Sequence, residues 1–451
     1  MRSMGIDIGT TTVSIALLDG ESGALVDKLT ENSNAFVPDA HPAGRTQDPE
    51  KIRALVRQGV EALTERHGKP DCIGFTGQMH GMLYVNARGE AVTPLYTWQD
   101  GRGGDALADG KSAAELFRAA GVASAPGYGL ATHLALLRRG EVPPQAARMV
   151  TIPDYVAMGL TGSAEPVIGA DMAASWGCYD LKERRFRRDV LEELGVDPAI
   201  LPREVRGHAV IGETPTGVPV TAAIGDNQAS VLGSVRDVGH TALINIGTGS
   251  QVSFGVDRFI ETGGSVELRP CTDRLNMLVG SGLCGGRAYA MLERFFRELT
   301  GQAHCYDLMQ RQAKAFVDEF GWGAAWQVRT TFTGTRDDPA ERGSIAGIGE
   351  DNFRPGALAA GMIAGILGEL HGMYAQMREL SGTGATALVG SGNGLRRNPL
   401  MRSLAEELFG LALKVPVWQE EAACGAALVA LAASGRVPSL EDAQARIAYE
   451  D

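Results

Sequence analysis

Apolar and polar residues alternate at two places in this chain, and the residue order is similar at both. Over residues 4–8, methionine and isoleucine alternate with glycine and aspartate, and the alternation resumes over 13–17 after a threonine-rich turn. The stretch ALINIGTGSQVSFG at 242–255 repeats the pattern just past the midpoint. A period of two residues is typical of half-buried strands, so each stretch predicts two strands joined by a tight turn.

The rest of the chain shows alternating helical and strand patterns. The first half predicts a helix over Glu50–Arg66, a buried strand over Cys72–Thr76, and a strand over Val218–Ile224 that leads into a helix. The second half predicts a helix over Gly361–Met377, a strand over Thr386–Val389, a glycine loop over Gly390–Gly394, a helix from Pro399 and a helix over Glu420–Ala433. This order predicts an α/β fold with one diverged repeat per half, a boundary near Gly233–Gly239, and domains 1–236 and 237–451.

The turn of each hairpin has the residues of a phosphate site. Glycine permits a tight bend, so that backbone N–H groups and threonine hydroxyls converge on phosphate oxygens. Asp7 stands beside the first turn, where it repels phosphate unless a divalent cation such as Mg2+ lies between them, and Asn245 takes its place in the second copy. One copy alone is equally well explained as an ordinary hairpin, but two in register predict a nucleotide held between two lobes. The predicted phosphate contacts are Gly9, Thr10, Thr11, Thr12, Gly247, Thr248 and Gly249.

Asp226 is the strongest candidate for a catalytic residue. It lies in IGDNQAS, where a predicted buried strand ends and a helix begins. Ligands of α/β sheets bind at such strand ends. A carboxylate suffices as the base in phosphoryl transfer, because the attacking hydroxyl becomes strongly acidic only as the new P–O bond forms. The alternative role is that of a helix N-cap, for which aspartate is favoured, and both roles are compatible.

Composition excludes several classes of protein. A net charge of -12 and an isoelectric point near 5.3 disfavour binding to nucleic acid. Six scattered cysteines without CxxC spacing argue against zinc and disulfides and favour a reducing cytoplasm. The N-terminus enters a strand at once, and the alanine-rich run 422–433 is too short to span a bilayer, so no export or membrane insertion is expected. Glycine is frequent, with 59 of 451 residues, which implies many close approaches of the backbone.

Two glycine-containing motifs imitate known nucleotide sites. The sequence ADGKSAAEL at 108–116 contains the GKS of a P-loop, but Asp105 occupies the first glycine position and no apolar strand precedes it. A helix start exposed to solvent is expected there instead. The GSGNG segment at 390–394 has the wrong glycine spacing for a dinucleotide fingerprint. It suits a flat approach of the backbone to an adenosine ring.

Four segments together resemble the FGGY family of carbohydrate kinases, which belong to the actin and hexokinase superfamily of two-lobed ATPases. They are GIDIGTTTVSIALLD, GDNQAS, NIGTGSQ and the C-terminal EEAACGAALVA, and the similarity covers nearly the whole chain. The resemblance implies a duplicated, ribonuclease H-like α/β fold with the active site in the cleft between the lobes. It implies that residues 1–236 bind the sugar and carry the catalytic base, and that 237–451 bind ATP.

Individual roles follow from the matched positions. The resemblance gives Asp7 the metal and phosphate role of the first loop, and Asp226 the role of general base close to Mg2+. It implies adenosine contacts for Gly390, Gly392 and Asn393. The family's usual GERTP segment is Gly334-Thr335-Arg336-Asp337-Asp338 here, so that the glutamate is lost and Arg336 remains.

A sugar needs hydrogen-bond donors, acceptors and an apolar wall, and two short segments supply all three. The family brings both segments to the sugar, which implies roles for Gln78, Met79, His80, Trp98, Asp100 and Arg102. Further candidates are Tyr128, Thr132, Asp154, Asp171, Asn227 and Gln228, the last two because the helix start fixes their direction. The alternatives are core positions for Met79 and Trp98, a structural histidine at 80, and turn or cap roles for Asp154 and Asp171.

Five further segments most resemble the family members that act on the seven-carbon ketose sedoheptulose: TGQMHGMLY, TWQDGRG, IPDYVAMGLTG, DMAASWGCYD and FTGTRDDPAERG. GQMHG also occurs in the xylulose kinases. The resemblance therefore implies ATP- and Mg2+-dependent phosphorylation of a terminal ketose hydroxyl, with sedoheptulose as substrate and xylulose or another short ketose as the alternative. A non-kinase ATPase or sugar sensor of the superfamily is the rival from another class. A cytoplasmic enzyme is expected, with a small-molecule sugar as partner and a homodimer as one possible assembly.

Overall fold

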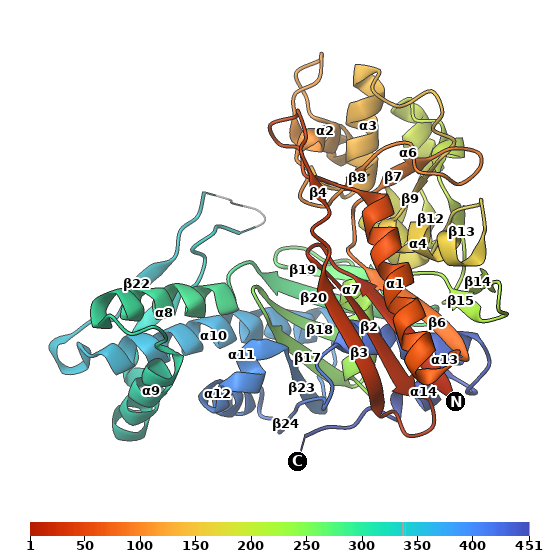
Figure 1. Cartoon of the computed structure of the whole chain (residues 1–451). Helices are drawn as coiled ribbons and strands as arrows, with labels where there is room; N and C mark the ends of the chain where they lie inside the picture. Colours follow the sequence, from red (N-terminus) through yellow and green to blue (C-terminus); the bar gives the residue numbers. More distant parts are fainter. Residues whose placement is uncertain (336–337, 339, 451) are drawn as a thin grey trace. The chain divides into compact units, whose positions relative to one another are not determined.

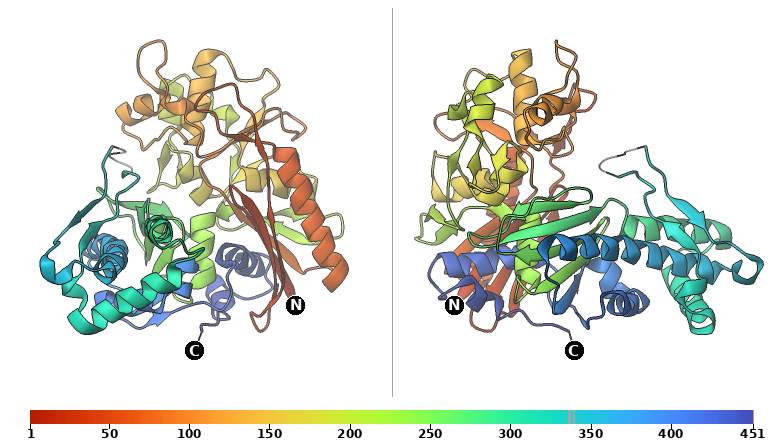
Figure 2. Two further views of the ribbon diagram at one scale, coloured as in Figure 1. Left: turned by 60° about the vertical axis from the view of Figure 1, so that its left-hand side comes forward. Right: turned by 180° about the vertical axis from the view of Figure 1, so that it is seen from behind.

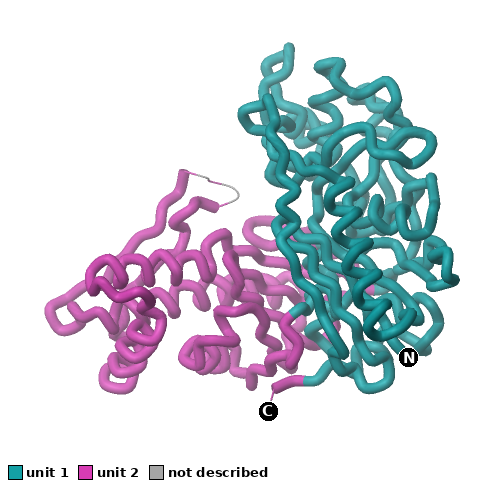
Figure 3. Tube along the Cα trace, in the orientation of Figure 1, with its two compact units in different colours: residues 1–236, 269–274, 420–448 teal, residues 237–268, 275–419, 449–451 magenta. Residues whose placement is uncertain are grey.

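The computed structural model describes residues 1–335, 338 and 340–450, and the chain divides into two compact units (Figure 3). Unit 1 comprises residues 1–236, 269–274 and 420–448, and unit 2 comprises 237–268, 275–419 and the C-terminal residues from 449. The longest segment of unit 1 ends at residue 236. The two later segments, however, return to unit 1, which the sequence did not predict.

Unit 1 contains a large sheet, several short strand pairs and the helices around them (Figure 1). Its strands are β1 (Arg2–Ile8), β2 (Thr12–Asp19), β3 (Leu25–Asn32), β4 (Phe36–Val37), β5 (Thr46–Gln47), β6 (Cys72–Gly77), β7 (Leu83–Val85), β8 (Leu95–Tyr96), β9 (Arg148–Val150), β10 (Val167–Ile168), β11 (Tyr179–Asp180), β12 (Arg185–Phe186), β13 (Arg203–Glu204), β14 (Val210–Glu213), β15 (Pro219–Thr221) and β16 (Ile224–Gly225). Its helices are α1 (Pro49–His67), α2 (Ala113–Ala119), α3 (Gly129–Arg139), α4 (Ile152–Thr161), α5 (Ala170–Ser175), α6 (Arg188–Glu193), α7 (Asp226–Ser234), α13 (Glu421–Ala433) and α14 (Leu440–Gln444), with 3-10 turns at η1 (Arg102–Gly104) and η2 (Pro198–Ile200).

The large sheet of unit 1 has the strand order β14-β15-β6-β1-β2-β3, with β16 also paired to β6. The first predicted hairpin is confirmed: β1 and β2 are antiparallel, and Asp7 lies opposite Ser14. Strand β6 runs parallel to β1. The single strand predicted over 218–224 is wrong, because Ala223 donates its N–H to Asp154 instead of to the ladder, which separates β15 from β16.

Helices cover both faces of this sheet. A side chain at Gly59 of α1 would meet Ile15, so α1 packs on the face that carries the apolar residues of the hairpin. On the other face, a Cβ at Gly5 would lie 1.7 Å from the carbonyl oxygen of Ala423, and Ser3 donates to the carbonyl of Ala427. Asp7 follows Ser3 and Gly5 at a spacing of two, so its side chain lies on the α13 face.

Helix α13 also packs on α7 with backbone against backbone. A Cβ at Gly233 of α7 would lie 2.0 Å from the carbonyl oxygen of Glu421, and a Cβ at Gly425 of α13 would lie 2.0 Å from that of Ala229. Only glycine permits helices to approach so closely. The helix predicted over Glu420–Ala433 is confirmed within one residue, and the helix predicted after Ile224 is confirmed as α7, but their packing is long-range and was not foreseen.

Unit 2 repeats the plan of the first sheet. Its strands are β17 (Thr241–Ile246), β18 (Ser250–Val256), β19 (Val266–Pro270), β20 (Asn276–Gly282), β21 (Gln327–Arg329), β22 (Ser344–Ala346), β23 (Ala387–Ser391) and β24 (Leu413–Lys414). Its helices are α8 (Gly286–Thr300), α9 (Tyr306–Phe320), α10 (Pro355–Ser381), α11 (Gly392–Arg397) and α12 (Pro399–Phe409), with 3-10 turns at η3 (Trp322–Ala324) and η4 (Glu350–Asn352).

The main sheet of unit 2 has the order β19-β20-β18-β17-β23-β24. The second predicted hairpin is confirmed, since β17 and β18 are antiparallel, with a third antiparallel strand on one side and the parallel β23 on the other. Unit 1 has the same arrangement with β1, β2, β3 and β6. Asn245 is the last residue but one of β17, as Asp7 is of β1, so the structural repeat is confirmed.

Helix α10 runs along the sheet of unit 2 (Figure 2). Among the described residues it is the one helix long and apolar enough to cross a membrane, with a mean hydropathy of 1.3 over its most apolar window. Of that window, 61% is buried inside the protein. A side chain at Gly280 of β20 would meet Met373 of α10, which shows that the helix packs on the sheet as a core element.

Two local predictions have different outcomes. Ser112 and Glu115 form a capping box at the start of α2, so the GKS segment is a helix start, as predicted. The glycine loop predicted over 390–394 is wrong: β23 continues to Ser391 and α11 begins at Gly392. Gly392, with a φ of 84°, makes the turn in a single residue.

Replacing Gly233 by alanine tests the contact between α7 and α13. Alanine favours a helix interior by about 1 kcal/mol. The new Cβ meets backbone atoms, however, and such overpacking typically costs about 1–3 kcal/mol. We expect Gly233→Ala to lower the free energy of unfolding in urea. Gly372→Ala in α10 is the matched control, because its Cβ meets no atom within 4 Å. Equal stabilisation of both variants would contradict the close packing.

Candidate active site

Asp7 and Asp226 stand on either side of β6 at the carboxyl end of the unit 1 sheet. Asp7 of β1 lies opposite Thr76 of β6, and Ile224 of β16 lies opposite the same threonine from the other side. Strands two apart are separated by roughly 10 Å. Asp226 opens α7 two residues after Ile224, so the two carboxylates face a common space at the strand ends.

The negative charge of the Asp7 carboxylate is poorly offset by its surroundings. Its Oδ1 is buried and has no hydrogen-bond partner among the described residues. Burial, followed by the negative charges of Asp226 and Glu420, raises the pKa of Asp7 to about 7. Glu420, at the start of α13, also pairs with Lys28 at 2.7 Å. The negative charge of Asp7 is thus poorly offset within the protein, and a bound cation would neutralise it.

Asp226 is the first helical residue of α7, and Gly225 is the N-cap, so the N-cap role considered for the aspartate is not the one it has. Its Oδ1 accepts the N–H of Asn227 at 2.7 Å. Burial raises the pKa of Asp226 to about 6, although this hydrogen bond and the positive charge of Arg269 lower it. A carboxylate with a pKa near 6 is a better proton acceptor than an ordinary aspartate.

Two other buried carboxylates hold the segment that precedes Asp226. Asp154 accepts the N–H of Ala223 at 2.9 Å, and Asp171 accepts that of Gly225 at 2.7 Å. Burial raises the pKa of Asp154 to about 7 and also raises that of Asp171. Asp154 lies in the first turn of α4 and Asp171 in that of α5. Their contacts in the structure fix the backbone and support the cap-like roles.

The carboxylates fit a magnesium ion that shares its coordination with phosphate. The described residues contain no cluster of three or more His, Cys, Asp or Glu side chains able to hold a metal alone. Mg2+ is commonly bound through one or two carboxylates, with substrate phosphates and water as the other ligands. The orphaned Oδ1 of Asp7 and the carboxylate of Asp226 are therefore suitable donors, and Mg2+ there would neutralise their charge.

A chain of side-chain hydrogen bonds supports the threonine turn after β1. Trp98 donates its indole N–H to Thr10 Oγ1 at 2.9 Å, and Gln47 donates to the Thr10 carbonyl at 2.6 Å. Gln78 in turn donates to Gln47 at 3.0 Å and is 2% exposed. In this structure Gln78 therefore supports the phosphate turn, and a contact with sugar remains a prediction. Thr11 is exposed at the tip of the turn.

His80 and Tyr128 form a rigid aromatic pair beside the same region. Their rings are stacked, with centroids 4.6 Å apart. His80 has a φ of 70°, which is rare for this residue type, and its Nδ1 bonds the Ser175 carbonyl at 2.6 Å. Trp98 is 47% exposed. An exposed indole and a fixed imidazole suit the apolar wall and the polar contact expected for a sugar.

Asp100 and Arg102 lie inside the protein. Arg102 donates to Asp100 Oδ1 at 2.7 Å and to Asp39 at 2.6 Å, and it covers the Tyr96 ring. The Asp100 carboxylate also accepts the N–H of Arg45. The two side chains are 1% and 6% exposed, so they hold their loop together, and direct contact with a sugar remains a prediction.

The other residues predicted to contact the sugar differ in how deeply they are buried. Gln228 is fully buried and donates to the carbonyl of Pro270, and Met79 packs against Gly225, so both are core residues in this structure. Thr132 is likewise buried in α3. Asn227 is half-buried and accepts a hydrogen bond from Arg269 at 3.3 Å. The core alternative stated for Met79 is thus the one the structure supports.

In unit 2, the turn after β17 is fixed by the start of α8. Gly286 donates to the carbonyl of Gly247 and Arg287 to that of Thr248, each at 2.9 Å. Asn245 donates to Ser391 Oγ at 2.7 Å, which ties β17 to β23. A neutral amide thus replaces the carboxylate of the first hairpin, so this turn offers phosphate hydrogen-bond donors without a repelling charge.

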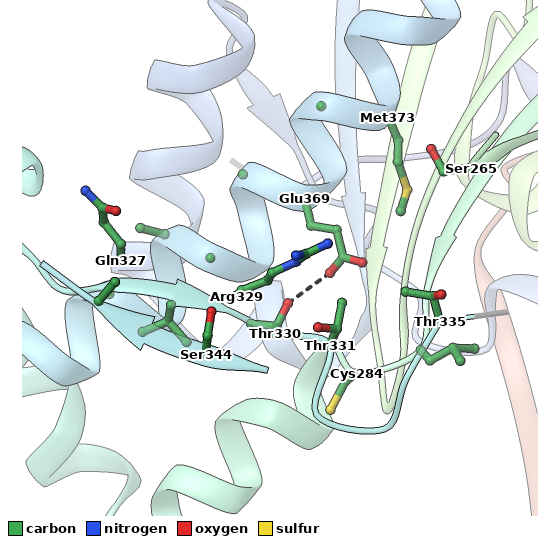
Figure 4. A pocket seen from close by; sticks show the side chains of 18 of the residues that line it. Ser265, Cys284, Gln327, Arg329, Thr330, Thr331, Thr335, Ser344, Glu369 and Met373 are labelled. Atoms are coloured by element: carbon green, nitrogen blue, oxygen red, sulfur yellow. Dashed lines mark hydrogen bonds between the residues drawn. The ribbon is translucent and has the colours of Figure 1, made fainter. Parts of the chain in front are cut away.

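The described residues of unit 2 line cavities of about 900 Å³ (Figure 4) and about 810 Å³, and the smaller of these opens beside this turn. Gly247, Thr248 and Asn393 line the smaller one, as the sequence predicts for a nucleotide. Gly249, Gly390 and Gly392 do not line it: Gly390 lies in β23 between leucines, and Gly392 packs on the Ile246 carbonyl. Arg336 lies outside the described residues.

Sequence reasoning missed most of this cavity's wall. Its further lining comes from α8, α9, α11 and α12, and includes Gly286, Arg287, Tyr289, Tyr306, Asp307, Gln310, Arg397 and Asn398. Tyr289 and Tyr306 are stacked with centroids 5.9 Å apart. The CGGRAY segment directly after a strand was the one available signal, because a glycine pair before a helix permits close approach to a ligand.

Comparisons with known proteins extend this picture. The FGGY family of carbohydrate kinases matches residues 3–233 with its N-terminal domain and 273–434 with its C-terminal domain. The chain is 28% identical to sedoheptulokinase of Mus musculus over 477 residues, which covers 95% of this chain and 97% of that protein. It is also 28% identical to xylulose kinase of Escherichia coli K12, but over 269 residues, or 56% of this chain and 54% of that protein.

The fold has solved counterparts. The crystal structure of xylulose kinase from Rhodospirillum rubrum matches with a TM-score of 0.85 and 20% identity, covering 100% of this chain and 93% of that one. This likeness confirms the predicted α/β fold of the actin and hexokinase type. With both family domains matched, the chain belongs to the FGGY family of carbohydrate kinases and is a phosphotransferase that uses ATP and acts on an alcohol group of a sugar.

Proposed function

We propose that this kinase phosphorylates the terminal hydroxyl of sedoheptulose and forms sedoheptulose 7-phosphate. The observation that carries the kinase chemistry is the pair Asp7 and Asp226 at neighbouring strand ends, where two buried carboxylates have raised pKa values. The choice of sugar is supported by the mouse relative, which is similar along nearly its whole length.

Asp226 acts as the general base in this proposal. Its carboxylate accepts the proton of the sugar hydroxyl as the new P–O bond forms. Asp7 and Asp226 would hold Mg2+, which would offset phosphate charge when bound, and the N–H groups of the Gly-Thr turns are suited to phosphate oxygens. The sugar binds to residues 1–236 and ATP to 237–451. Exclusion of water lets the hydroxyl, and not water, attack the γ-phosphate.

Xylulose is the second candidate substrate, because the xylulose kinase of Escherichia coli K12 matches 56% of the chain and GQMHG also occurs in xylulose kinases. We place the enzyme in the cytoplasm, since all six cysteines are free and buried. Free thiols are usual in a reducing compartment.

Turnover across a panel of sugars decides the substrate. ADP release is measured with sedoheptulose, xylulose, ribulose, fructose and glycerol at matched ATP and Mg2+. We expect the highest kcat/KM for sedoheptulose. A kcat/KM for xylulose well above that for sedoheptulose overturns the choice of sugar and leaves the kinase chemistry intact.

Asp226→Asn tests the base. The amide keeps the shape of the side chain but accepts no proton, so we expect kcat to fall by at least about 10²-fold. Sugar affinity, measured by calorimetry without nucleotide, should be nearly unchanged. The exposed Asp189→Asn in α6 is the control, and near-normal turnover of Asp226→Asn removes this residue from the role of base.

Asp171→Ala tests how the base is positioned. The change leaves the Gly225 N–H without its acceptor in a buried place. Such a loss costs about 1–3 kcal/mol of stability. We expect kcat to fall more than the KM for sugar rises, and Asp171→Asn, whose amide oxygen accepts the same bond, to restore part of kcat. An unchanged kcat in folded Asp171→Ala shows that the hydrogen bond is not needed.

A further inference from the structure

Gln47 is a fully buried polar residue beside the turn after β1. Its side chain is 0% exposed, whereas glutamine is usually found at the surface. It is the last residue of β5, lies opposite Leu95 of β8, and directly precedes Asp48, the N-cap of α1. Strand pairing and the helix cap together fix the backbone from which this amide extends.

The Gln47 amide forms hydrogen bonds through both its oxygen and its nitrogen. The oxygen accepts the side-chain N–H of Gln78 at 3.0 Å, and the nitrogen donates to the Thr10 carbonyl at 2.6 Å. A reversed amide would set its oxygen against the carbonyl oxygen of Thr10, so the two bonds fix its direction. Gln78 is itself tied to the end of β1, because its backbone N–H donates to the Ile8 carbonyl at 2.9 Å. Packing alone does not account for a glutamine here, since an apolar side chain would fill the same space.

The turn after β1 is held through its carbonyl groups. Residues 9–11 lie in neither strand of the hairpin. Gln47 donates to the carbonyl of Thr10, and the N–H of Ser33 donates to the carbonyl of Thr11 at 2.8 Å. The peptide bonds of the described residues are trans, and the C=O and N–H of one trans peptide point in opposite directions. The N–H of Thr11, an exposed residue, therefore points away from Gln47.

The hydroxyl of Thr10 is oriented in a similar way. Trp98 donates its indole N–H to Thr10 Oγ1 at 2.9 Å. An indole has no acceptor, so the threonine hydroxyl accepts this bond and keeps its own hydrogen for another partner. The turn thus uses its carbonyl oxygens within the protein and has N–H and O–H groups left over, and these are the groups that phosphate oxygens require.

We infer that Gln47 is a positioning residue of the kinase, which holds the Thr10 carbonyl so that the donors of the turn face the phosphate. Gln47 touches no substrate itself and acts through Thr10. This role rests on the proposed function, because it requires the turn after β1 to bind phosphate. A small shift of the turn matters, since a misplacement of about 1 Å can cost about 10²-fold in rate.

Gln47→Met tests this role, with Gln444→Met as the matched control. Methionine fills nearly the same space and forms neither bond. Gln444 of α14 is also buried, and its amide donates to the carbonyls of Leu232 and Val235, so the control loses a comparable buried amide outside the turn. Turnover is measured with the panel sugar that the unchanged protein phosphorylates fastest. We expect kcat to be at least about tenfold lower in Gln47→Met than in Gln444→Met.

Two further measurements separate positioning from packing. Sugar affinity, measured by calorimetry without nucleotide, should differ by less than about threefold between the two variants. Gln47→Glu keeps the shape of the side chain, and its carboxylate accepts the bond from Gln78 but donates to Thr10 only when it is protonated. We expect its kcat, relative to the unchanged protein at the same pH, to fall as the pH rises from about 6 to about 9 and ionises this buried carboxyl.

Thr10→Val reports on the turn itself, because it removes the hydroxyl. If Thr10→Val lowers kcat and Gln47→Met does not, the turn binds phosphate but Gln47 does not position it. If neither lowers kcat, the phosphate role of the turn fails together with that of Gln47. A kcat of Gln47→Met within about threefold of that of Gln444→Met, or a relative kcat of Gln47→Glu that is independent of pH, overturns the role of Gln47.

Discussion

The contact of α13 with the sheet and with α7 fixes the geometry of unit 1. Backbone touches backbone at Gly5, Gly74, Gly233 and Gly425, because these residues carry no Cβ. Asp7 extends from the strand that rests on α13, and Asp226 opens the helix that packs beside it. Since neither element has room to shift against α13, the distance between the two carboxylates is set by packing density and not by the carboxylates, which repel each other.

That repulsion acts on a carboxylate whose Oδ1 has no hydrogen-bond partner among the described residues. Burial disfavours the ionised forms of both Asp7 and Asp226, and the negative charges of Asp226 and Glu420 add to this effect at Asp7. In the second hairpin the equivalent position is Asn245, which is bonded to Ser391 and adds no charge. The two repeats have therefore diverged at this position, which holds a carboxylate in the first hairpin and a neutral amide in the second.

Much of this arrangement follows from local sequence. Both hairpins, the helix starts at Asp226 and Pro399 and the repeat were predicted, because they depend on periodicity and turn residues close together in the chain. Side-chain directions at the site were harder. Arg102 turns inward because Asp39, 63 positions away, completes its ion pair, and such distant partners leave no pattern in the sequence. The cavity beside the Gly-Thr turn of unit 2 was only partly foreseen, since α8 and α9 supply much of its wall.

The return of residues 420–448 to unit 1 has a consequence for synthesis of the protein. Chains are usually made at about 5–20 residues per second, and N-terminal domains commonly fold while the rest is still being made. Here the sheet of unit 1 keeps one glycine-lined face uncovered until α13 emerges. Almost all residues of unit 2 are synthesised after residue 236 and before α13. Unit 2 is therefore free to fold before unit 1 is complete, and the later half of the chain is positioned to mature first.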